Sequence, residues 1–181
     1  MATYSILGIC GALRAGSTNR QLLREAVRHF APARYEEADL RLPLYDGDLE
    51  EAEGIPPEVA RLADQIARAD AVLISTPEYN KALSGVLKNA LDWVSRTEGD
   101  PWAGKPVAIM SAAAGRSGGE RAQSSLRLAL APFQARLVAG PEVLIAAARS
   151  AFDEAGRLTN PRSEKALASL MDRLKEDLAR G

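Results

Sequence analysis

Short apolar runs alternate along this chain with longer segments in which apolar residues recur every three or four positions. The apolar runs, several of them rich in β-branched residues, occupy 4–9, 71–75, 106–114 and part of 135–146. The periodic segments are 19–30, 59–67, 85–96, 120–133 and 163–180. An apolar run of this length is typical of a strand buried on both faces, and the periodic segments are typical of amphipathic helices.

The order of these segments predicts the fold class. Strand and helix patterns alternate, with a further strand predicted at 34–40, and such alternation favours an open, parallel, doubly wound α/β sheet with helices on both faces. Residues 41–57 are rich in proline, glycine and acidic residues and predict a long surface loop. Because no linker, repeat or low-complexity segment interrupts the pattern, residues 1–181 are expected to form a single domain.

Composition narrows the range of partners. The chain has 23 basic and 24 acidic residues, so its charge as a whole favours neither nucleic acid nor an anionic membrane. No apolar run approaches the roughly 18 residues of a membrane-spanning helix. Cys10 is the single cysteine, which excludes an intrachain disulfide. We therefore expect a soluble, cytoplasmic protein with no nucleic-acid or membrane partner.

The stretch GALRAGSTNR, residues 11–20, follows the first predicted strand and has the parts of an anion-binding loop. Gly11 and Gly16 keep the spacing of a triphosphate loop, but Ser17 stands where the phosphate-binding lysine belongs. The following helix directs the positive end of its dipole at the loop, and Arg14 adds charge. These features favour a terminal monophosphate. An ordinary strand-to-helix turn with a capping side chain would use the same residue types.

Two more loops are expected beside this one. TPEYNKALSG, residues 76–85, follows the second buried strand, and SAAAGRSGGER, residues 111–121, follows the third. In a doubly wound sheet, ligands bind outside the carboxyl ends of the strands. The three loops therefore predict one common site.

These loops resemble the NADPH-dependent FMN reductases of flavodoxin-like fold, a family that includes bacterial chromate and quinone reductases. GALRAGSTNR is similar to the family's G-S-L-R-x-G-S-x-N-x loop. PEYNKALSGVLKNALDWVSR resembles its P-E-Y-N-x-x-x-x-G-x-L-K-N-x-x-D-W segment, and GRSGGERAQSSLR resembles its G-x-x-G-G-x-R-x-Q-x-x-L-R segment. The motifs occur in the family's order and cover most of the chain.

The resemblance implies a five-stranded flavodoxin-like sheet and an FMN site with neither a metal nor a catalytic side chain. The residues expected at the FMN phosphate are Arg14, Ser17, Asn19 and Arg20. Those expected beside the isoalloxazine ring are Pro77, Glu78, Tyr79 and Asn80, with Ser111, Gly115 and Arg116 at its other edge. Glu78 and Asn80 have a plainer interpretation as residues that order a turn.

The expected activity is transfer of hydride from NADPH or NADH through FMN to a quinone, a flavin or a similar small-molecule acceptor. The resemblance also implies a homodimer or homotetramer. One alternative is an FMN-binding electron carrier or regulatory protein without NAD(P)H turnover, and another is a nucleotide-binding module without flavin. Flavodoxins tend to be strongly acidic, so the nearly neutral charge of this chain favours the enzyme.

Three conspicuous residues have structural interpretations. Trp93 lies in a helical apolar pattern, which indicates packing or a subunit contact rather than catalysis. His29 lies on a predicted amphipathic helix away from the loops, so a structural or solvent-exposed role is expected. Cys10 is expected to be a small buried residue.

Overall fold

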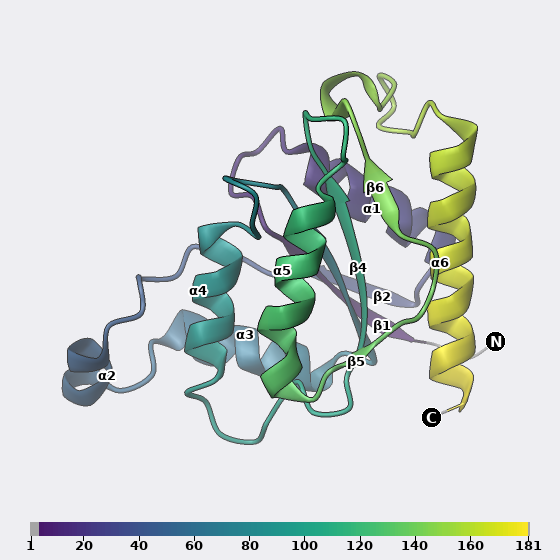
Figure 1. Cartoon of the computed structure of the whole chain (residues 1–181). Coiled ribbons are helices and arrows are strands. Elements are labelled where there is room, and N and C mark those ends of the chain that lie inside the picture. The colour runs from purple at the N-terminus through teal and green to yellow at the C-terminus, as the bar shows by residue number, and fades with distance from the viewer. Residues whose placement is uncertain (1–3, 181) are drawn as a thin grey trace.

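A computed structural model describes residues 4–180 and shows a parallel sheet between two layers of helices (Figure 1). The four longest strands are β1 (Ser5–Cys10), β2 (Arg34–Glu37), β3 (Ala71–Thr76) and β4 (Pro106–Ala112). Their order is β2-β1-β3-β4, and all of their pairings are parallel. From β1 the chain adds β2 on one side of the sheet and β3 and β4 on the other, so the switch in winding direction lies between β1 and β3, as in the flavodoxin-like fold.

The fifth position of the sheet holds two short strands in place of the single run expected within 135–146. These strands, β5 (Arg136–Leu137) and β6 (Val143–Ile145), both pair with β4. Gly140 and Pro141 lie between them. Proline has no N–H to donate to a ladder, which explains why pairing stops here and resumes after it. The predicted five-stranded sheet is thus correct in its five positions, but the last strand is divided.

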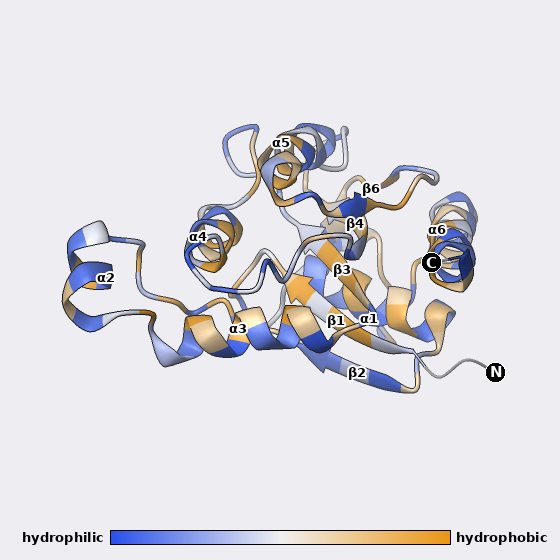
Figure 2. Cartoon of the chain, turned by 90° about the horizontal axis from the view of Figure 1, so that it is seen from below, coloured by the Kyte–Doolittle hydropathy of each residue, from blue (hydrophilic) through white to orange (hydrophobic). Residues whose placement is uncertain are grey.

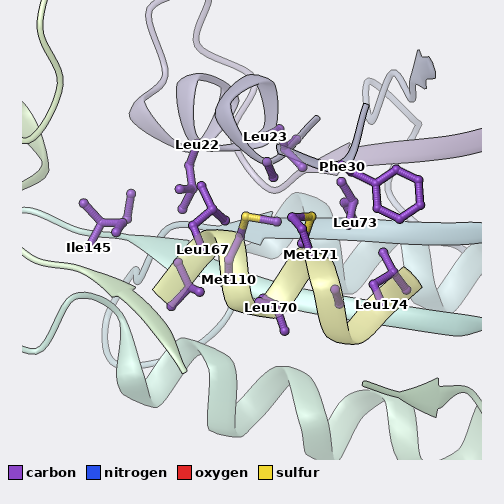
Figure 3. Packing of buried hydrophobic residues seen from close by; sticks show 14 of the residues in the cluster. Leu22, Leu23, Phe30, Leu73, Met110, Ile145, Leu167, Leu170, Met171 and Leu174 are labelled. Atoms are coloured by element: carbon purple, nitrogen blue, oxygen red, sulfur yellow. The ribbon is translucent and has the colours of Figure 1, made fainter. Parts of the chain in front are cut away.

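The helices cover both faces of the sheet, as predicted (Figure 2). One face carries α1 (Thr18–Phe30) and α6 (Pro161–Arg180), and the other carries α3 (Pro57–Arg68), α4 (Gly85–Val94) and α5 (Glu120–Leu130). Figure 3 shows the core on the face that α1 and α6 cover. There Leu22 and Leu23 of α1 and Leu170 and Met171 of α6 pack around Met110 of β4. Burial of this many apolar side chains on two faces fixes the strand ends that carry the loops.

One predicted loop contains a helix. Within residues 41–57 the structure has α2 (Gly47–Glu53), which Figure 1 shows projecting away from the sheet. Its side chains are not buried, so its sequence carries no apolar periodicity by which it could be recognised. Asp46 caps it by accepting a hydrogen bond from the Asp48 N–H at 3.0 Å. The predicted segment therefore lies at the surface as expected, but part of it is a helix and not a loop.

The segment before α2 is fastened to α4. The Pro43 carbonyl accepts hydrogen bonds from Trp93 Nε1 at 2.8 Å and from Asn89 Nδ2 at 2.9 Å. The ring of Tyr45 stands edge-on to that of Trp93, with 5.0 Å between ring centroids. Trp93 is fully buried, which gives it the packing role predicted for it. Among residues 4–180, no helix is long and apolar enough to cross a membrane.

Candidate functional site

The loops at the carboxyl ends of the strands enclose a cleft of ≈ 250 Å³. Its walls come from the loops that follow β1, β3 and β4 and from the 3₁₀ turn Ala148–Ser150, which follows β6. The lining residues are Ala12, Arg14, Gly16, Ser17, Thr18, Asn19, Pro77, Glu78, Tyr79, Ala112, Ala113, Ala114, Ala148 and Arg149. The structure thus brings together residues from all three of the predicted loops.

The loop between β1 and α1 ends in a helix cap. Ser17 is the N-cap of α1, and its hydroxyl accepts a hydrogen bond from the Asn19 N–H at 3.2 Å. The Ser17 N–H donates to the Arg14 carbonyl at 3.2 Å, which closes the loop. The first amide groups of a helix have no intrahelical acceptor and carry the positive end of the dipole. This end of the cleft therefore presents backbone donors to an anion.

Asn19 is 2% exposed, and its side-chain amide bonds to protein on both sides. Its Oδ1 accepts from the Ala112 N–H and from Ser75 Oγ, both at 2.9 Å, and its Nδ2 donates to the Ala112 carbonyl at 2.9 Å. Although Asn19 borders the cleft, these bonds commit its amide to holding α1 above the ends of β3 and β4. Its part in the site is to position the helix terminus.

The two arginines of this loop differ in their surroundings. Arg20 forms an ion pair with Glu37 of β2 through its Nε, and its guanidinium donates to the Arg14 carbonyl at 3.1 Å. It braces the loop from outside and does not line the cleft. Arg14 is exposed and lines the cleft. Of the two cations predicted near a phosphate, only Arg14 lies at the cavity.

The loop after β3 ends in a tight turn. The N–H groups of Tyr79 and Ala82 each donate to the other residue's carbonyl at 3.1 Å. Asn80 and Lys81 between them have φ of 49° and 66°, as a two-residue type I′ turn requires. Tyr79 remains 57% exposed at the cleft, whereas Asn80 lies outside the cleft lining.

Glu78 connects this turn to α5. Its Oε2 accepts hydrogen bonds from the Arg121 N–H at 3.1 Å and the Ala122 N–H at 3.4 Å. The N-cap of α5 is Gly119, which has no side chain to satisfy these amides. Glu78 supplies the missing cap while it also lines the cleft. Its structural part is therefore to hold the start of a helix, which differs from the turn-ordering interpretation.

The loop after β4 is held by a buried hydroxyl and two glycines. Ser111 is 0% exposed, and its Oγ donates to the Gly118 carbonyl at 2.7 Å and accepts from Gln123 Nε2 at 2.9 Å. Gly118 and Gly119 have φ of 62° and 94°. A Cβ on Gly118 would lie 2.6 Å from the Leu144 carbonyl carbon. Ser111 therefore shapes this loop from beneath, outside the cleft lining.

The remaining residues predicted on this loop are Gly115 and Arg116. Both are exposed, and both lie outside the cleft lining. The Gly115 carbonyl accepts from the Ala147 N–H at 3.4 Å, which joins this loop to the segment after β6.

Arg149 and Ala148 line the cleft but belong to none of the predicted motifs. The Ala148 N–H donates to the Ala113 carbonyl at 3.1 Å, which places the 3₁₀ turn beside the β4 loop. Residues that follow the last strand of a parallel sheet lie at the same edge as the other loops. That topological rule was the available signal, because the sequence around Arg149 has no distinctive spacing.

Cys10 lies directly before the first loop and is buried. Its Sγ donates to the Ala12 carbonyl at 3.4 Å. Burial raises the pKa of this thiol, which keeps it protonated at neutral pH. Cys10 is thus a small buried residue, as predicted.

A comparison with known protein families shows the family to which the chain belongs. The model of the NADPH-dependent FMN reductase family matches residues 4–150. The chain belongs to this family. The resemblance drawn from the three loop motifs is thereby confirmed, and so are the class of enzyme and the cofactor that the family's name states.

Individual proteins similar to this FMN reductase family member support the same assignment. An NAD(P)H-dependent FMN reductase of Pseudomonas aeruginosa is 44% identical over 172 residues, covering 94% of this chain and 92% of the relative. A quinone reductase of Escherichia coli is 43% identical over 143 residues, covering 77% and 76%. The solved structure of the flavoenzyme NAD(P)H:(acceptor) oxidoreductase FerB from Paracoccus denitrificans matches with a TM-score of 0.87, 31% identity and 98% coverage of both chains. The flavodoxin-like fold is confirmed.

Proposed function

We propose that this FMN reductase family member holds FMN in the cleft and passes electrons from NADPH or NADH to a quinone, a flavin or a similar small-molecule acceptor. The observation that carries the proposal is the composition of the cleft. An anion-binding helix terminus forms one part of it, and the turn that carries Tyr79 forms another. The family and the named activities of its relatives support the same reaction.

The donors at the α1 terminus fit a phosphate monoester. Arg14 supplies a cation, Thr18 a hydroxyl, and the first turn of α1 supplies backbone amides. Ser17 caps the helix, and Asn19 and Arg20 hold its position, so these predicted phosphate residues act through the loop that they shape. A monophosphate needs no P-loop lysine, which is consistent with Ser17 at that position.

The loops after β3 and β4 suit a flat ring. Pro77 and Tyr79 offer apolar and aromatic surface, and the alanines Ala112–Ala114 keep the cleft open because their side chains are short. Bound FMN supplies the hydride chemistry, while the protein binds and orients it. Asn80, Gly115 and Arg116 lie beyond the lining, where we propose that they border the entry of the second substrate. No residue is assigned as a catalytic acid or base.

Anaerobic spectroscopy tests this proposal. The visible spectrum of the protein with stoichiometric FMN is recorded before and after addition of NADPH, then NADH, then a quinone. We expect either nucleotide to bleach the bound flavin faster than it bleaches free FMN, and the quinone to restore the colour. A bound flavin that stays oxidised with both nucleotides yet is bleached by dithionite would establish the electron carrier instead.

We also propose that the protein is a homodimer or homotetramer. Leu44 is 82% exposed and Leu128 is 77% exposed, and large exposed apolar side chains are frequent at subunit interfaces. Size-exclusion chromatography with light scattering tests this, because a monomer at micromolar concentration would contradict it. A cytoplasmic location is part of the proposal and rests on the single buried cysteine. Cell fractionation tests that location.

A further inference from the structure

Two arginines line the cleft from loops that follow different strands. Arg14 follows β1, and Arg149 follows β6. Among residues 4–180, neither guanidinium forms an ion pair or a side-chain hydrogen bond, whereas Arg20 is paired with Glu37. A cluster of like charges without a counterion at a cavity favours an anionic ligand.

The sheet order places these arginines on two sides of the helix terminus. Between β1 and β6 lie β3 and β4, so three strand spacings, about 14 Å, separate the two strands. Asn19 fastens the first turn of α1 to Ser75 of β3 and Ala112 of β4. The amides of α1 therefore lie above the two central strands, with the Arg14 loop on one side and the Arg149 turn on the other.

The backbone around Arg149 is held firmly. Ala147 and Ala148 donate hydrogen bonds to carbonyls of the β4 loop, at 3.4 Å to Gly115 and 3.1 Å to Ala113. Ala147 has a φ of 46°, in the left-handed region that a residue with a Cβ adopts only when its surroundings impose it. The residue before the 3₁₀ turn is thus strained, and this conformation directs the chain into the turn that carries Arg149.

Resting on the proposed function, we infer that Arg149 is a second phosphate-binding residue of the FMN site. With Arg14 it binds the terminal phosphate from two sides, while the α1 amides bind it from below. Arginine suits this role because its planar guanidinium offers several donors to phosphate oxygens. Two cations from separate loops also make the affinity depend on the charge of the phosphate, which distinguishes FMN from riboflavin.

The test is the affinity of Arg149→Gln for two flavins, measured by flavin fluorescence in equilibrium titrations of the apoprotein. We expect the Kd for FMN to rise roughly 10- to 100-fold, because a charged hydrogen-bond donor is lost. The Kd for riboflavin, which lacks the phosphate, should change less than about threefold. Arg149→Lys retains the charge and should recover part of the FMN affinity.

The matched control is Arg157→Gln, which removes the same charge from the same segment but outside the cleft lining. It should leave both Kd values unchanged. An FMN affinity of Arg149→Gln equal to that of the wild type would overturn the inference and leave the proposed function intact. Equal losses for FMN and riboflavin would also overturn it, since they would indicate a general disturbance of the cleft. A wild-type protein that binds no FMN would overturn the proposed function together with the inference.

The pH dependence gives a second readout. The second proton of a phosphate monoester binds near pH 6, so a site built for the dianion loses affinity below that pH. We expect the wild-type Kd for FMN to rise between about pH 7 and pH 5, and the Arg149→Gln Kd to rise less steeply. Identical slopes in the two proteins would contradict a direct contact between Arg149 and the phosphate.

Discussion

The β1–α1 loop and the β4–α5 loop both border the cleft, yet different devices hold them in shape. The first is fixed by side chains, because Asn19 bonds to β3 and β4 and Arg20 bonds to β2 and to the loop itself. The second is fixed by backbone conformation, because Gly118 and Gly119 adopt a positive φ over the hydroxyl of Ser111. The first device can be removed one hydrogen bond at a time, whereas the second depends on the absence of a side chain.

Within the β1–α1 loop, the residues that hold the loop in shape differ from the groups that can contact a ligand. Most polar side chains of the first motif are committed to protein partners, so the backbone amides, Arg14 and Thr18 are left to meet a ligand. The motif therefore encodes a loop conformation more than a set of ligand contacts.

Asn19→Ala should have the largest effect. It removes three buried hydrogen bonds and leaves partners on β3 and β4 unsatisfied, so the free energy of unfolding should fall by about 3 kcal/mol. Urea denaturation measures this. Asn160→Ala is the matched control, because Asn160 caps α6 at the surface and should cost only about 1 kcal/mol. If the two variants were equally stable, Asn19 would not hold the loop.

Gly118→Ala disturbs the backbone conformation that fixes the β4–α5 loop. The new Cβ would meet the Leu144 backbone at 2.6 Å in a left-handed conformation, so we expect a loss of about 2–3 kcal/mol. The control is Gly115→Ala in the same loop, where a Cβ meets no atom of the described chain, residues 4–180, within 4 Å. That variant should stay within about 0.5 kcal/mol of the wild type in thermal or urea unfolding. Similar losses in both would show that the loop is held by something other than its glycine pair.

Glu78 lies between the two devices, since it belongs to the β3 loop and caps α5. Glu78→Ala should lower the free energy of unfolding by about 1 kcal/mol, because the Arg121 and Ala122 amides lose their acceptor. Glu78→Gln retains an acceptor oxygen and should lose less than half as much. Both variants should bind FMN more weakly than the wild type if Glu78 also borders the ring. Unchanged FMN affinity in both would remove Glu78 from the proposed site.

Tyr35→Phe should have the smallest effect, and it touches neither loop. The Tyr35 hydroxyl is buried without a hydrogen-bond partner among residues 4–180, so its removal should stabilise the protein by roughly 0.5–1 kcal/mol. A destabilised variant in urea denaturation would show that the hydroxyl has a partner after all.

Tyr35 also gives a pH signature. Burial, followed by the negative charge of Glu37, raises the pKa of its phenol above the ordinary value near 10. The folded state therefore keeps a proton that the unfolded state releases, and stability falls as the pH rises above about 10. Cys10 acts in the same direction, because burial raises the pKa of its thiol as well. The alkaline loss of stability should be shallower in Tyr35→Phe than in the wild type.

Sequence patterns were sufficient for the elements that bury apolar surface. Strands β1, β3 and β4 are mostly apolar runs, and α1, α4 and α5 carry apolar stripes. Because an element that packs into the core needs apolar residues at regular positions, its sequence shows a recognisable pattern. None of the residues of α2 is buried, so this helix left no such signal. The division between β5 and β6 was likewise missed, although Gly140 and Pro141 between the two apolar pairs are residues that interrupt a strand.

The site was predictable as a set of loops but not as a set of contacts. The motifs identified the three loops and the family, and six of the predicted residues line the cleft: Arg14, Ser17, Asn19, Pro77, Glu78 and Tyr79. The bonds of Asn19 to Ala112 join positions 93 apart, so no local pattern reveals them. Arg149 likewise reaches the cleft through strand order alone.

The hydrogen bonds of Asn19 have a consequence for the order of events in folding. The segment from β1 to α1 contains the whole phosphate-loop motif, yet the helix terminus is fastened only after β4 has joined the sheet. Closing so long a stretch of chain is a late and entropically costly step. The nascent amino-terminal part therefore lacks the contacts that hold the helix terminus. If FMN binds at this loop as proposed, we expect it to bind the completed chain. We therefore expect added FMN to raise the melting temperature by mass action rather than to guide the chain to its fold.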